Sequence, residues 1–459
     1  MNLKRRLERL VGAAPRLRTS SGALAASAAA TAGERGAPES SRSPSSQAPP
    51  SSGIFAVQPA AAAPDAARQR KLDELRLQMQ ALLGRDERAS PPPRRPSPSL
   101  RLEALPFTPQ STPRGVLWQR VERLEPAHRV GRVALEEAGA ADARWLAHLA
   151  LDPALAGSAP ESWLFVDTET TGLGGSGTLV FLVGLAAIEP SGAVVLEQLL
   201  LAEPSEEVAL LERLRERVQA ASALVSFNGK AFDRPMLDSR AVLNRLPALP
   251  ARPHFDLLHV GRRLHRQRLG CCTLRRVESE VLGFDRGDDI DGSEVAAIYS
   301  HFLRTADATG LSAVIAHNFT DVVSMVALVA LYGQRTPALV AEDLAGLART
   351  LKRAGATRHA ERVADIACER GGGVEAFRVR AELAKSRGDC SSAVRDFEQL
   401  CREVDDPSGR LELAKLYEHK LRQPARALHW LELGTAEDQH AQTRRRERLE
   451  RKLRRDPAP

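Results

Sequence analysis

The hydrophobic positions from Thr112 to Leu331 predict a packed domain that mixes strands and helices. Three short apolar runs, separated by Gly-containing turns, favour successive strands over residues 164–166, 178–188 and 194–201. A helix then starts at Pro204, with acidic residues in its first turn and leucines on one face, and residues 224–227 predict a short buried strand. Later apolar periodicity predicts helices over residues 272–282, 293–303 and 311–332. This order predicts a mixed α/β sheet flanked by helices.

Residues 336–434 predict an all-α domain built from paired helices. The pairs Leu347-Ala348, Leu383-Ala384 and Leu413-Ala414 recur with Ala-to-Ala steps of 36 and 30 residues. These steps bracket the roughly 34-residue period of tetratricopeptide repeats. An ordinary helical bundle is the alternative that the drifting spacing leaves open. Residues 435–459 form a basic tail, either an exposed helix extension or a nucleic-acid contact.

The first part of the chain has a different composition. Residues 1–111 are dominated by Ala, Ser, Pro and Arg, which predicts a mostly disordered region. One exception is the segment 70–83, where apolar residues have the spacing of a short amphipathic helix. The predicted domains are therefore residues 1–111, 112–335, 336–434 and 435–459.

Composition narrows the class of protein. A chain of 459 residues is too long for one compact core. Its five cysteines show no Cys-x-x-Cys spacing, which argues against a zinc site or a disulfide framework and favours a cytoplasmic location. No stretch of about 18 apolar residues runs without a charge, so no membrane partner is expected. The net charge of +7 permits a polyanionic partner.

Two acidic residues stand at the end of the first predicted strand. Asp167 and Glu169 follow the apolar run that starts at Trp163, and residues two apart on a strand face the same side. Two adjacent carboxylates at the edge of a core are costly unless a cation binds between them. Taken alone, the pair is more simply interpreted as a solvated rim of the sheet.

Further acidic positions follow along the chain. Asp233 comes after the fourth predicted strand, in the first turn of a helix, and His317 and Asp321 share one face of an apolar helix. The chain thus supplies four candidate metal ligands: Asp167, Glu169, Asp233 and Asp321. Four carboxylates can hold two divalent ions about 3.5–4 Å apart, and hard oxygen ligands select Mg²⁺ or Mn²⁺. His317 is placed to orient or deprotonate an attacking water.

These motifs resemble those of the DEDD exonucleases. That superfamily has an Asp-x-Glu motif, an Asn-containing turn followed by Phe-Asp or Tyr-Asp, and a Tyr or His upstream of a last Asp. Six segments look more narrowly like those of the YprB-like ribonuclease-H-like proteins: 165–173, 177–184, 255–259, 281–283, 288–294 and 317–322. The resemblance covers residues 112–331, and in that family helical repeats often follow.

The resemblance implies a ribonuclease-H-like fold and metal-dependent hydrolysis of DNA or RNA, typically from a 3′ end. Thr168, Asn228 and Lys230 lie within the first two motifs and are candidate substrate contacts. The chain departs from the family at the third motif. Enzymes of the His type place their His five residues before the last Asp, whereas His317 has the four-residue spacing of the Tyr type. His317 is therefore a base, a residue that orients water, or a member of a hydrogen-bond network.

Other positions have simpler interpretations. Asp256, Asp288 and Asp289 lie outside the three motifs and are expected to cap helices or support loops. A basic run forms either a solvated helix face or a groove for a phosphate backbone: Arg262, Arg263, His265, Arg266, Arg268, Arg275 and Arg276. The leading hypothesis is a two-metal 3′–5′ exonuclease. The alternative is a catalytically silent nucleic-acid-binding protein, or an adaptor that recruits a protein partner through its helical repeats.

Overall fold

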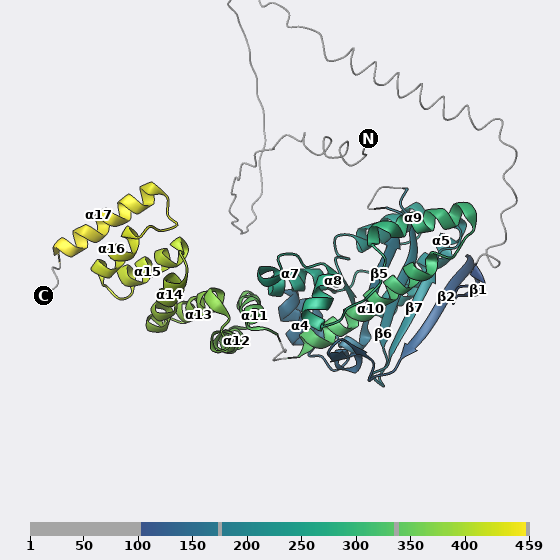
Figure 1. The fold of residues 1–459 in the computed structure, drawn as a ribbon, viewed down its shortest axis with the longest axis horizontal. Helices are drawn as coiled ribbons and strands as arrows, with labels where there is room; N and C mark the ends of the chain where they lie inside the picture. Colours follow the sequence, from purple (N-terminus) through teal and green to yellow (C-terminus); the bar gives the residue numbers. More distant parts are fainter. Residues whose placement is uncertain (1–101, 173–176, 335–338, 456–459) are drawn as a thin grey trace, which may run out of the picture. The chain divides into compact units, whose positions relative to one another are not determined.

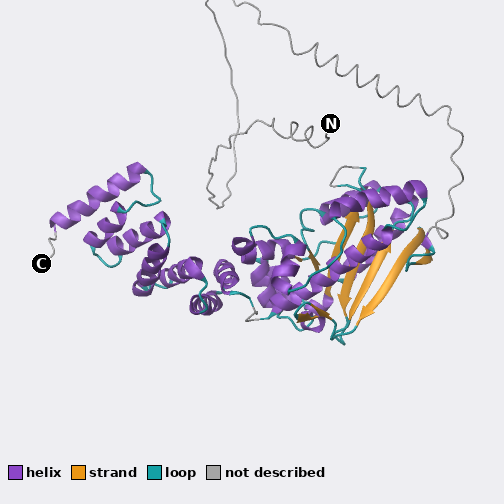
Figure 2. Ribbon diagram, viewed as in Figure 1, coloured by secondary structure: helices purple, strands orange, loops and turns teal. Residues whose placement is uncertain are grey.

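The computed structural model describes residues 102–172, 177–334 and 339–455. In these residues a seven-stranded mixed sheet with helices is followed by a run of helices, which confirms the predicted fold class (Figures 1 and 2). The described residues begin at residue 102. The predicted disordered region up to residue 101, with its helical segment 70–83, therefore lies outside them. Leu102, Leu105 and Phe107 are buried and a strand begins at Thr108, so folded structure starts before Thr112.

The sheet has the strand order β1-β2-β7-β6-β5-β8-β9. Neighbours from β1 to β5 are antiparallel, whereas β8 and β9 continue the sheet in parallel. The strands are β1 (Thr108–Thr112), β2 (Gly115–Leu124), β5 (Trp163–Thr170), β6 (Val180–Ile188), β7 (Val194–Leu200), β8 (Ala223–Ser226) and β9 (His254–Asp256). A separate ladder joins β3 (Arg129–Val130) and β4 (Val133–Ala134). The four predicted strands correspond to β5, β6, β7 and β8.

Seven helices accompany this sheet in the described residues. They are α4 (Ala143–Ala150), α5 (Glu207–Ala220), α6 (Asp233–Leu243), α7 (Leu257–Leu269), α8 (Leu274–Val277), α9 (Gly292–Thr305) and α10 (Leu311–Gly333). The predicted helix 272–282 is divided, because α8 continues as a wider π turn over Glu278–Leu282. Turns of this kind interrupt regular helices, frequently at functional sites.

Alternating side chains of the strands join two hydrophobic clusters, one on each face of the sheet. Trp163 and Phe165 of β5 pack with α4, α7 and part of α10, whereas Leu164 packs with α5, α6 and α9. A shift of β5 by one residue would exchange these faces, so burial fixes its register. The same alternation places Asp167 and Glu169 on the Phe165 face of the strand.

α10 is the longest helix of this domain and packs against β5 and β6. Among the described residues it is the one helix long and apolar enough to cross a membrane by length and composition. Most of its apolar window is buried inside the protein, as in the core helix of a folded domain, so this composition is weak evidence for a span. The expectation of no membrane partner stays a prediction.

The remaining helices follow in sequence, each packed on the next. They are α11 (Ala341–Arg353), α12 (Thr357–Glu369), α13 (Gly373–Ser386), α14 (Cys390–Glu403), α15 (Pro407–His419), α16 (Pro424–Glu432) and α17 (Gln439–Arg455). The recurring Leu-Ala pairs are buried in α11, α13 and α15. The basic tail is helical and packs on its neighbours through Leu449, which is fully buried.

α11 also packs on α7, and this contact joins the run of helices α11–α17 to the sheet domain through one hydrophobic cluster. Gly346 permits the approach, because a Cβ there would lie 2.9 Å from the backbone oxygen of Arg263. Asp343 of α11 accepts a hydrogen bond of 2.7 Å from Arg268 and lies 2.9 Å from Nδ1 of the buried His265. Two residues of the predicted basic run therefore serve this helix contact.

Candidate active site

The first acidic pair lies where β5 meets α10. Asp167 is paired in the sheet with Gly184 of β6, and the missing side chain of Gly184 lets α10 approach the sheet. A Cβ at Gly184 would collide with Asn318 and lie 2.7 Å from Val322. Because of this approach, Asn318 Nδ2 donates a 2.8 Å hydrogen bond to Asp167 Oδ2. Asn318 lies one helical turn before Asp321, so this bond brings the first and third motifs together.

The second motif is held by a buried carboxylate that caps α7. Asn228 has a left-handed backbone (φ 73°), as its place in the predicted turn requires. Its N–H donates to Asp256 Oδ1 at 3.0 Å, and the N–H of Lys230 donates to Asp256 Oδ2 at 3.1 Å. Asp256 also accepts from the N–H of Leu258, which confirms the expected capping role. The turn delivers Asp233 to the start of α6, where Thr168 Oγ1 donates to its carboxylate.

His317 and Asp321 lie on one face of α10 and meet two further charged residues. His317 Nδ1 lies 2.9 Å from Asp289, and its Nε2 lies 3.8 Å from Asp321 Oδ2. The guanidinium of Arg286 forms ion pairs with Asp321 and, at 3.0 Å, with Asp289. Arg286 also donates two 2.6 Å hydrogen bonds to Glu278 in the π turn. Since Arg286 is nearly buried, this network is part of the folded core.

The carboxylates of the three motifs repel each other. Burial raises the pKa of Asp167 well above its usual range, and the charges of Asp321, Glu169 and Asp233 raise it further. Burial likewise raises the pKa of Glu169 to about 7 and that of Asp233 to about 6. Burial also raises the pKa of Asp321, even though Arg286 and His317 lower it. The four acids from β5, α6 and α10 thus share one region whose negative charge is only partly compensated.

The donor chemistry of this region fits a divalent cation, which prefers charged oxygen ligands. Asp321 Oδ1 is buried and receives no well-aligned hydrogen bond from the described residues, although the Arg286 guanidinium lies against it. The distances between the side chains fit a metal site less well than their chemistry does. No group of three or more His, Cys, Asp or Glu in the described ranges is close enough to hold a metal ion. The assignment of Asp167, Glu169, Asp233 and Asp321 as metal ligands therefore stays a prediction.

The candidate substrate contacts are used partly inside the protein. The hydroxyl of Thr168 is occupied by Asp233, and the backbone of Asn228 by Asp256. The Lys230 ammonium is partly exposed and lies 3.9 Å from Asp152. A role for these three residues in substrate binding stays a prediction.

Sequence reasoning missed part of the site. Asp289 was expected to be a capping or loop-supporting residue, but it contacts His317 and Arg286 beside Asp321. Arg286 and Glu278 were not singled out, and Asn318 was given no role although it lies in the segment 317–322. Asp289 belongs to the segment 288–294 that carries the family resemblance, and this was the available signal. No spacing rule connects Glu278 to Arg286, because a turn of irregular geometry brings them together.

Comparison with known proteins gives the class of this domain. Residues 164–332 match a family model described as RNase_H superfamily. The match is to an RNase_H superfamily domain, and the matched residues run from β5 to α10 and include the candidate catalytic residues. Nucleases of this superfamily commonly use divalent metal ions.

Among curated proteins, the chain is similar to "Uncharacterized protein YprB" of Bacillus subtilis (strain 168). The two are 33% identical over 280 residues, which is 60% of this chain and 60% of the relative. The chain thus matches about three fifths of the relative's length. The likeness agrees with the YprB-like segments in the sequence, and it brings no activity with it.

Proposed function

We propose that this protein is a metal-dependent nuclease that hydrolyses phosphodiester bonds from the 3′ end of DNA or RNA. The proposal is supported most by the gathering of four acidic side chains from β5, α6 and α10 in one partly buried region. Burial raises the pKa of all four acids, and the charges of neighbouring acids raise those of Asp167 and Glu169 further, so the protein maintains an arrangement that is unfavourable without a bound cation. The RNase_H superfamily match agrees with a nucleic-acid substrate.

The four acidic side chains would hold one or two Mg²⁺ or Mn²⁺ ions. Such ions would polarise the scissile phosphate and stabilise the charge that develops on the attacking and leaving oxygens. The residues of the chain position these ligands: Asn318 fixes Asp167, Thr168 fixes Asp233, and Arg286 fixes Asp321.

His317 would act on the attacking water. The carboxylate of Asp289 can only accept a hydrogen bond, so we assign the ring proton of His317 to Nδ1, which leaves the Nε2 lone pair available. Nε2 lies on the Asp321 side of the ring, toward the acidic region. Asp289 therefore gives His317 a fixed orientation in place of the missing five-residue spacing. A base held in this way accepts a proton from water without first reorienting.

The proposal is tested by hydrolysis of 3′-labelled single-stranded DNA and RNA with Mg²⁺ or Mn²⁺. We expect metal-dependent shortening from the 3′ end by the wild type and a loss of more than ~100-fold in Asp167→Asn. Even residues that only support metal ligands cost ~10–100-fold when removed. The matched control is Asp307→Asn, an exposed loop residue, which should cleave at the wild-type rate.

Two results would overturn parts of this proposal. Absence of metal-dependent cleavage of both polymers would favour the alternative, a silent nucleic-acid-binding or adaptor protein acting through its helical repeats. Equal cleavage by wild type and Asp167→Asn would leave a nuclease whose site lies elsewhere.

A further inference from the structure

The basic run on α7 divides into residues that serve the fold and residues that do not. Arg263 donates to the backbone oxygen of Leu149 at 2.8 Å, and His265 and Arg268 bind Asp343 of α11. Arg262 and Arg266 are exposed, and neither side chain forms an ion pair or hydrogen bond within the described residues. These two arginines are four apart on one helix, so they share a face.

Arg262 and Arg266 line a cavity of about 560 Å³. The cavity is also lined by Phe227 and Asn228, which directly follow β8 and begin the turn of the second motif. Phe227 is half-buried, packs against the core and is one of the residues that line the cavity. The cavity therefore combines two unpaired guanidinium groups with an aromatic surface, the combination that proteins use to bind single-stranded nucleic acid.

The cavity is rigidly connected to the acidic region. Asp256 caps the helix that carries both arginines and also binds the backbone of Asn228 and Lys230. The same turn packs against Asp233, because a Cβ on Gly229 would lie 3.1 Å from Asp233 Oδ2. A strand bound in the cavity would therefore lie beside the turn that supplies one of the candidate metal ligands.

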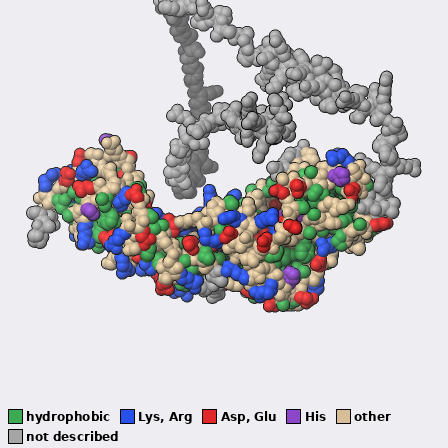
Figure 3. Space-filling view, in the orientation of Figure 1, with side chains coloured by type: hydrophobic (Ala, Val, Ile, Leu, Met, Phe, Trp, Pro, Cys, Tyr) green, Lys and Arg blue, Asp and Glu red, His purple; other side chains and the backbone are tan. Residues whose placement is uncertain are grey.

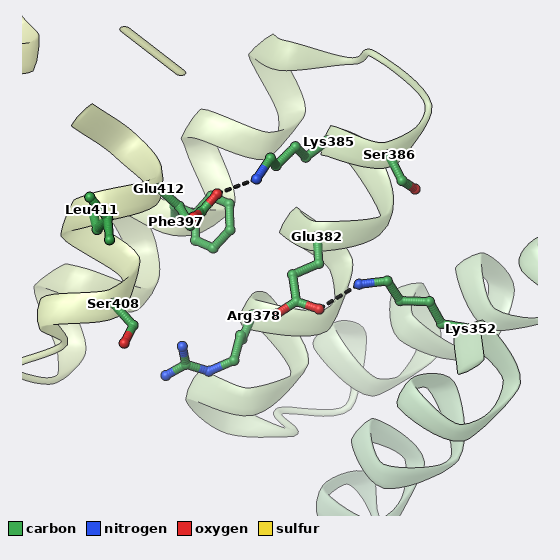
Figure 4. A pocket seen from close by; sticks show the side chains of 9 residues that line it. All are labelled: Lys352, Arg378, Glu382, Lys385, Ser386, Phe397, Ser408, Leu411 and Glu412. Atoms are coloured by element: carbon green, nitrogen blue, oxygen red, sulfur yellow. Dashed lines mark hydrogen bonds and ion pairs between the residues drawn. The ribbon is translucent and has the colours of Figure 1, made fainter. Parts of the chain in front are cut away.

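A second cavity of similar size differs from this one because its basic side chains already have carboxylate partners. It has a volume of about 590 Å³ and lies among α11, α13, α14 and α15, where it is also lined by basic side chains (Figure 4). There Lys352 lies 2.6 Å from Glu382, and Lys385 is paired with Glu412, as the dashed lines in Figure 4 show. Arg378 is paired with Asp406. Cations that already have carboxylate partners gain little from a phosphate, whereas Arg262 and Arg266 gain a counter-ion.

We propose that Arg262, Arg266 and Phe227 form the binding track for the single-stranded 3′ segment of the nucleic-acid substrate. This inference rests on the proposed nuclease function and adds the form of the substrate and the residues that hold it. The two arginines are separated by about 6 Å along the helix axis, so each contacts its own phosphate. Phe227 stacks on one base, which holds the strand without reading its sequence.

The test measures binding of a fluorescein-labelled 12-nucleotide single strand, as DNA and as RNA, to the full chain in EDTA. Binding is recorded as a function of salt, because each phosphate contact on a single strand contributes about 0.7 to the slope of log K against log salt. We expect Arg262→Gln/Arg266→Gln to lower the slope by about 1.4 and to weaken binding roughly tenfold or more at ~0.1 M salt. Phe227→Leu should weaken binding ~5-fold or more without changing the slope.

The matched control is Arg304→Gln/Arg358→Gln, which removes two exposed arginines and the same charge from α9 and α12. Its slope should equal that of the wild type. An Arg262→Gln/Arg266→Gln protein with the wild-type slope and affinity would overturn the inference. Equal dependence on these arginines for a blunt duplex would overturn the single-strand assignment.

Cleavage measured on the same proteins separates this inference from the proposed function. Arginine-dependent binding by a wild type that does not cleave would support the binding track and contradict the proposed nuclease activity. Cleavage by a wild type whose binding does not depend on Arg262 and Arg266 would support the nuclease activity and contradict the binding track. A wild type that neither binds nor cleaves would remove both.

Discussion

Glu418 in α15 and Asp167 in β5 are both acidic side chains drawn away from water, but their surroundings differ. Glu418 receives hydrogen bonds from Arg445, Arg448 and Lys452 of α17. Burial alone would raise the pKa of Glu418, but the bonds from Arg448 and Lys452 lower it to about 2. Asp167 has the amide of Asn318 and three acidic neighbours, and its pKa is raised. Acids of the same kind are thus neutralised in one region and left repelling each other in the other.

The contrast extends beyond these two residues. In the run of helices α11–α17, Asp396 binds Arg380, and on the visible face acidic and basic side chains are interspersed (Figure 3). Opposite charges brought together by folding need no further partner, so this region is complete as it stands. The acidic region of the sheet domain is stable only as long as the rest of the fold holds it together. Paired charges of the first kind stabilise the fold, whereas uncompensated charges of the second kind are available to bind a ligand.

Breaking the ion pairs of Arg286 should give the largest effect on stability, because Arg286 pairs with buried acids as the cations of helices α11–α17 do. Arg286→Met leaves Glu278, which is fully buried, without a counter-ion. Removing one partner of a buried pair costs about 3–5 kcal/mol. We expect a loss of that size in the free energy of unfolding, measured by urea denaturation.

Two further variants show whether this loss comes from the pairing. Glu278→Gln/Arg286→Met removes the unpaired charge and should recover part of the lost stability. Arg275→Met, at an exposed arginine on the preceding helix, should change stability by less than about 0.5 kcal/mol. A loss below about 1 kcal/mol in Arg286→Met would mean that Arg286 does not compensate the buried acids.

The sequence predicted the parts of this comparison that local patterns control. The Leu-Ala pairs marked the buried faces of α11, α13 and α15, and the apolar run before Asp167 marked β5. β1 was missed because its residues are polar and exposed, as an edge strand permits. β9 was missed because three residues are too few to show a period.

The chemistry followed the same division. Asp167, Glu169, Asp233 and Asp321 were found because their motifs are continuous in sequence and lie at the ends of predictable elements. Arg286 and Glu278 were missed because their contact depends on a π turn that no periodicity predicts. Arg262 and Arg263 are adjacent in sequence, and only the folded structure distinguishes them. Arg263 donates to the backbone oxygen of Leu149, whereas Arg262 lines a cavity.

Removing Glu418 should produce a smaller loss than removing Arg286, because two of its three cationic partners are about 40% exposed. We expect Glu418→Gln to lose about 2 kcal/mol at pH 7. A lowered pKa means that the folded state binds this proton less tightly than the unfolded state does. The contribution is therefore complete above the usual pKa of about 4.5 and is lost as the pH falls toward 2.

The measurement is urea denaturation of wild type and Glu418→Gln from pH 7 to pH 2.5. The difference between them should shrink below pH 4.5. The control is Glu432→Gln on α16, an exposed acid without a partner among the described residues, which should match the wild type throughout. A difference that stays constant with pH would show that Glu418 acts by packing instead of by charge.

The smallest expected effect has the opposite sign and belongs to the acidic region. Burial and the charges of Asp321 and Asp233 raise the pKa of Glu169 to about 7, although His317 lowers it. A raised carboxyl pKa means that stability is lost as the pH rises from about 4.5 through 7. Glu169→Gln should therefore be more stable than the wild type by on the order of 1 kcal/mol at pH 8 in EDTA, and equal to it below pH 4.5.

Mg²⁺ should make the wild type the more stable protein, because a cation that binds the native acids stabilises only the protein that retains them. Thermal unfolding of both proteins in EDTA and in Mg²⁺, with Glu161→Gln as the exposed control, measures both effects. A Glu169→Gln protein that is less stable than the wild type in EDTA at pH 8 would place this acid with Glu418, among the charges that build the structure.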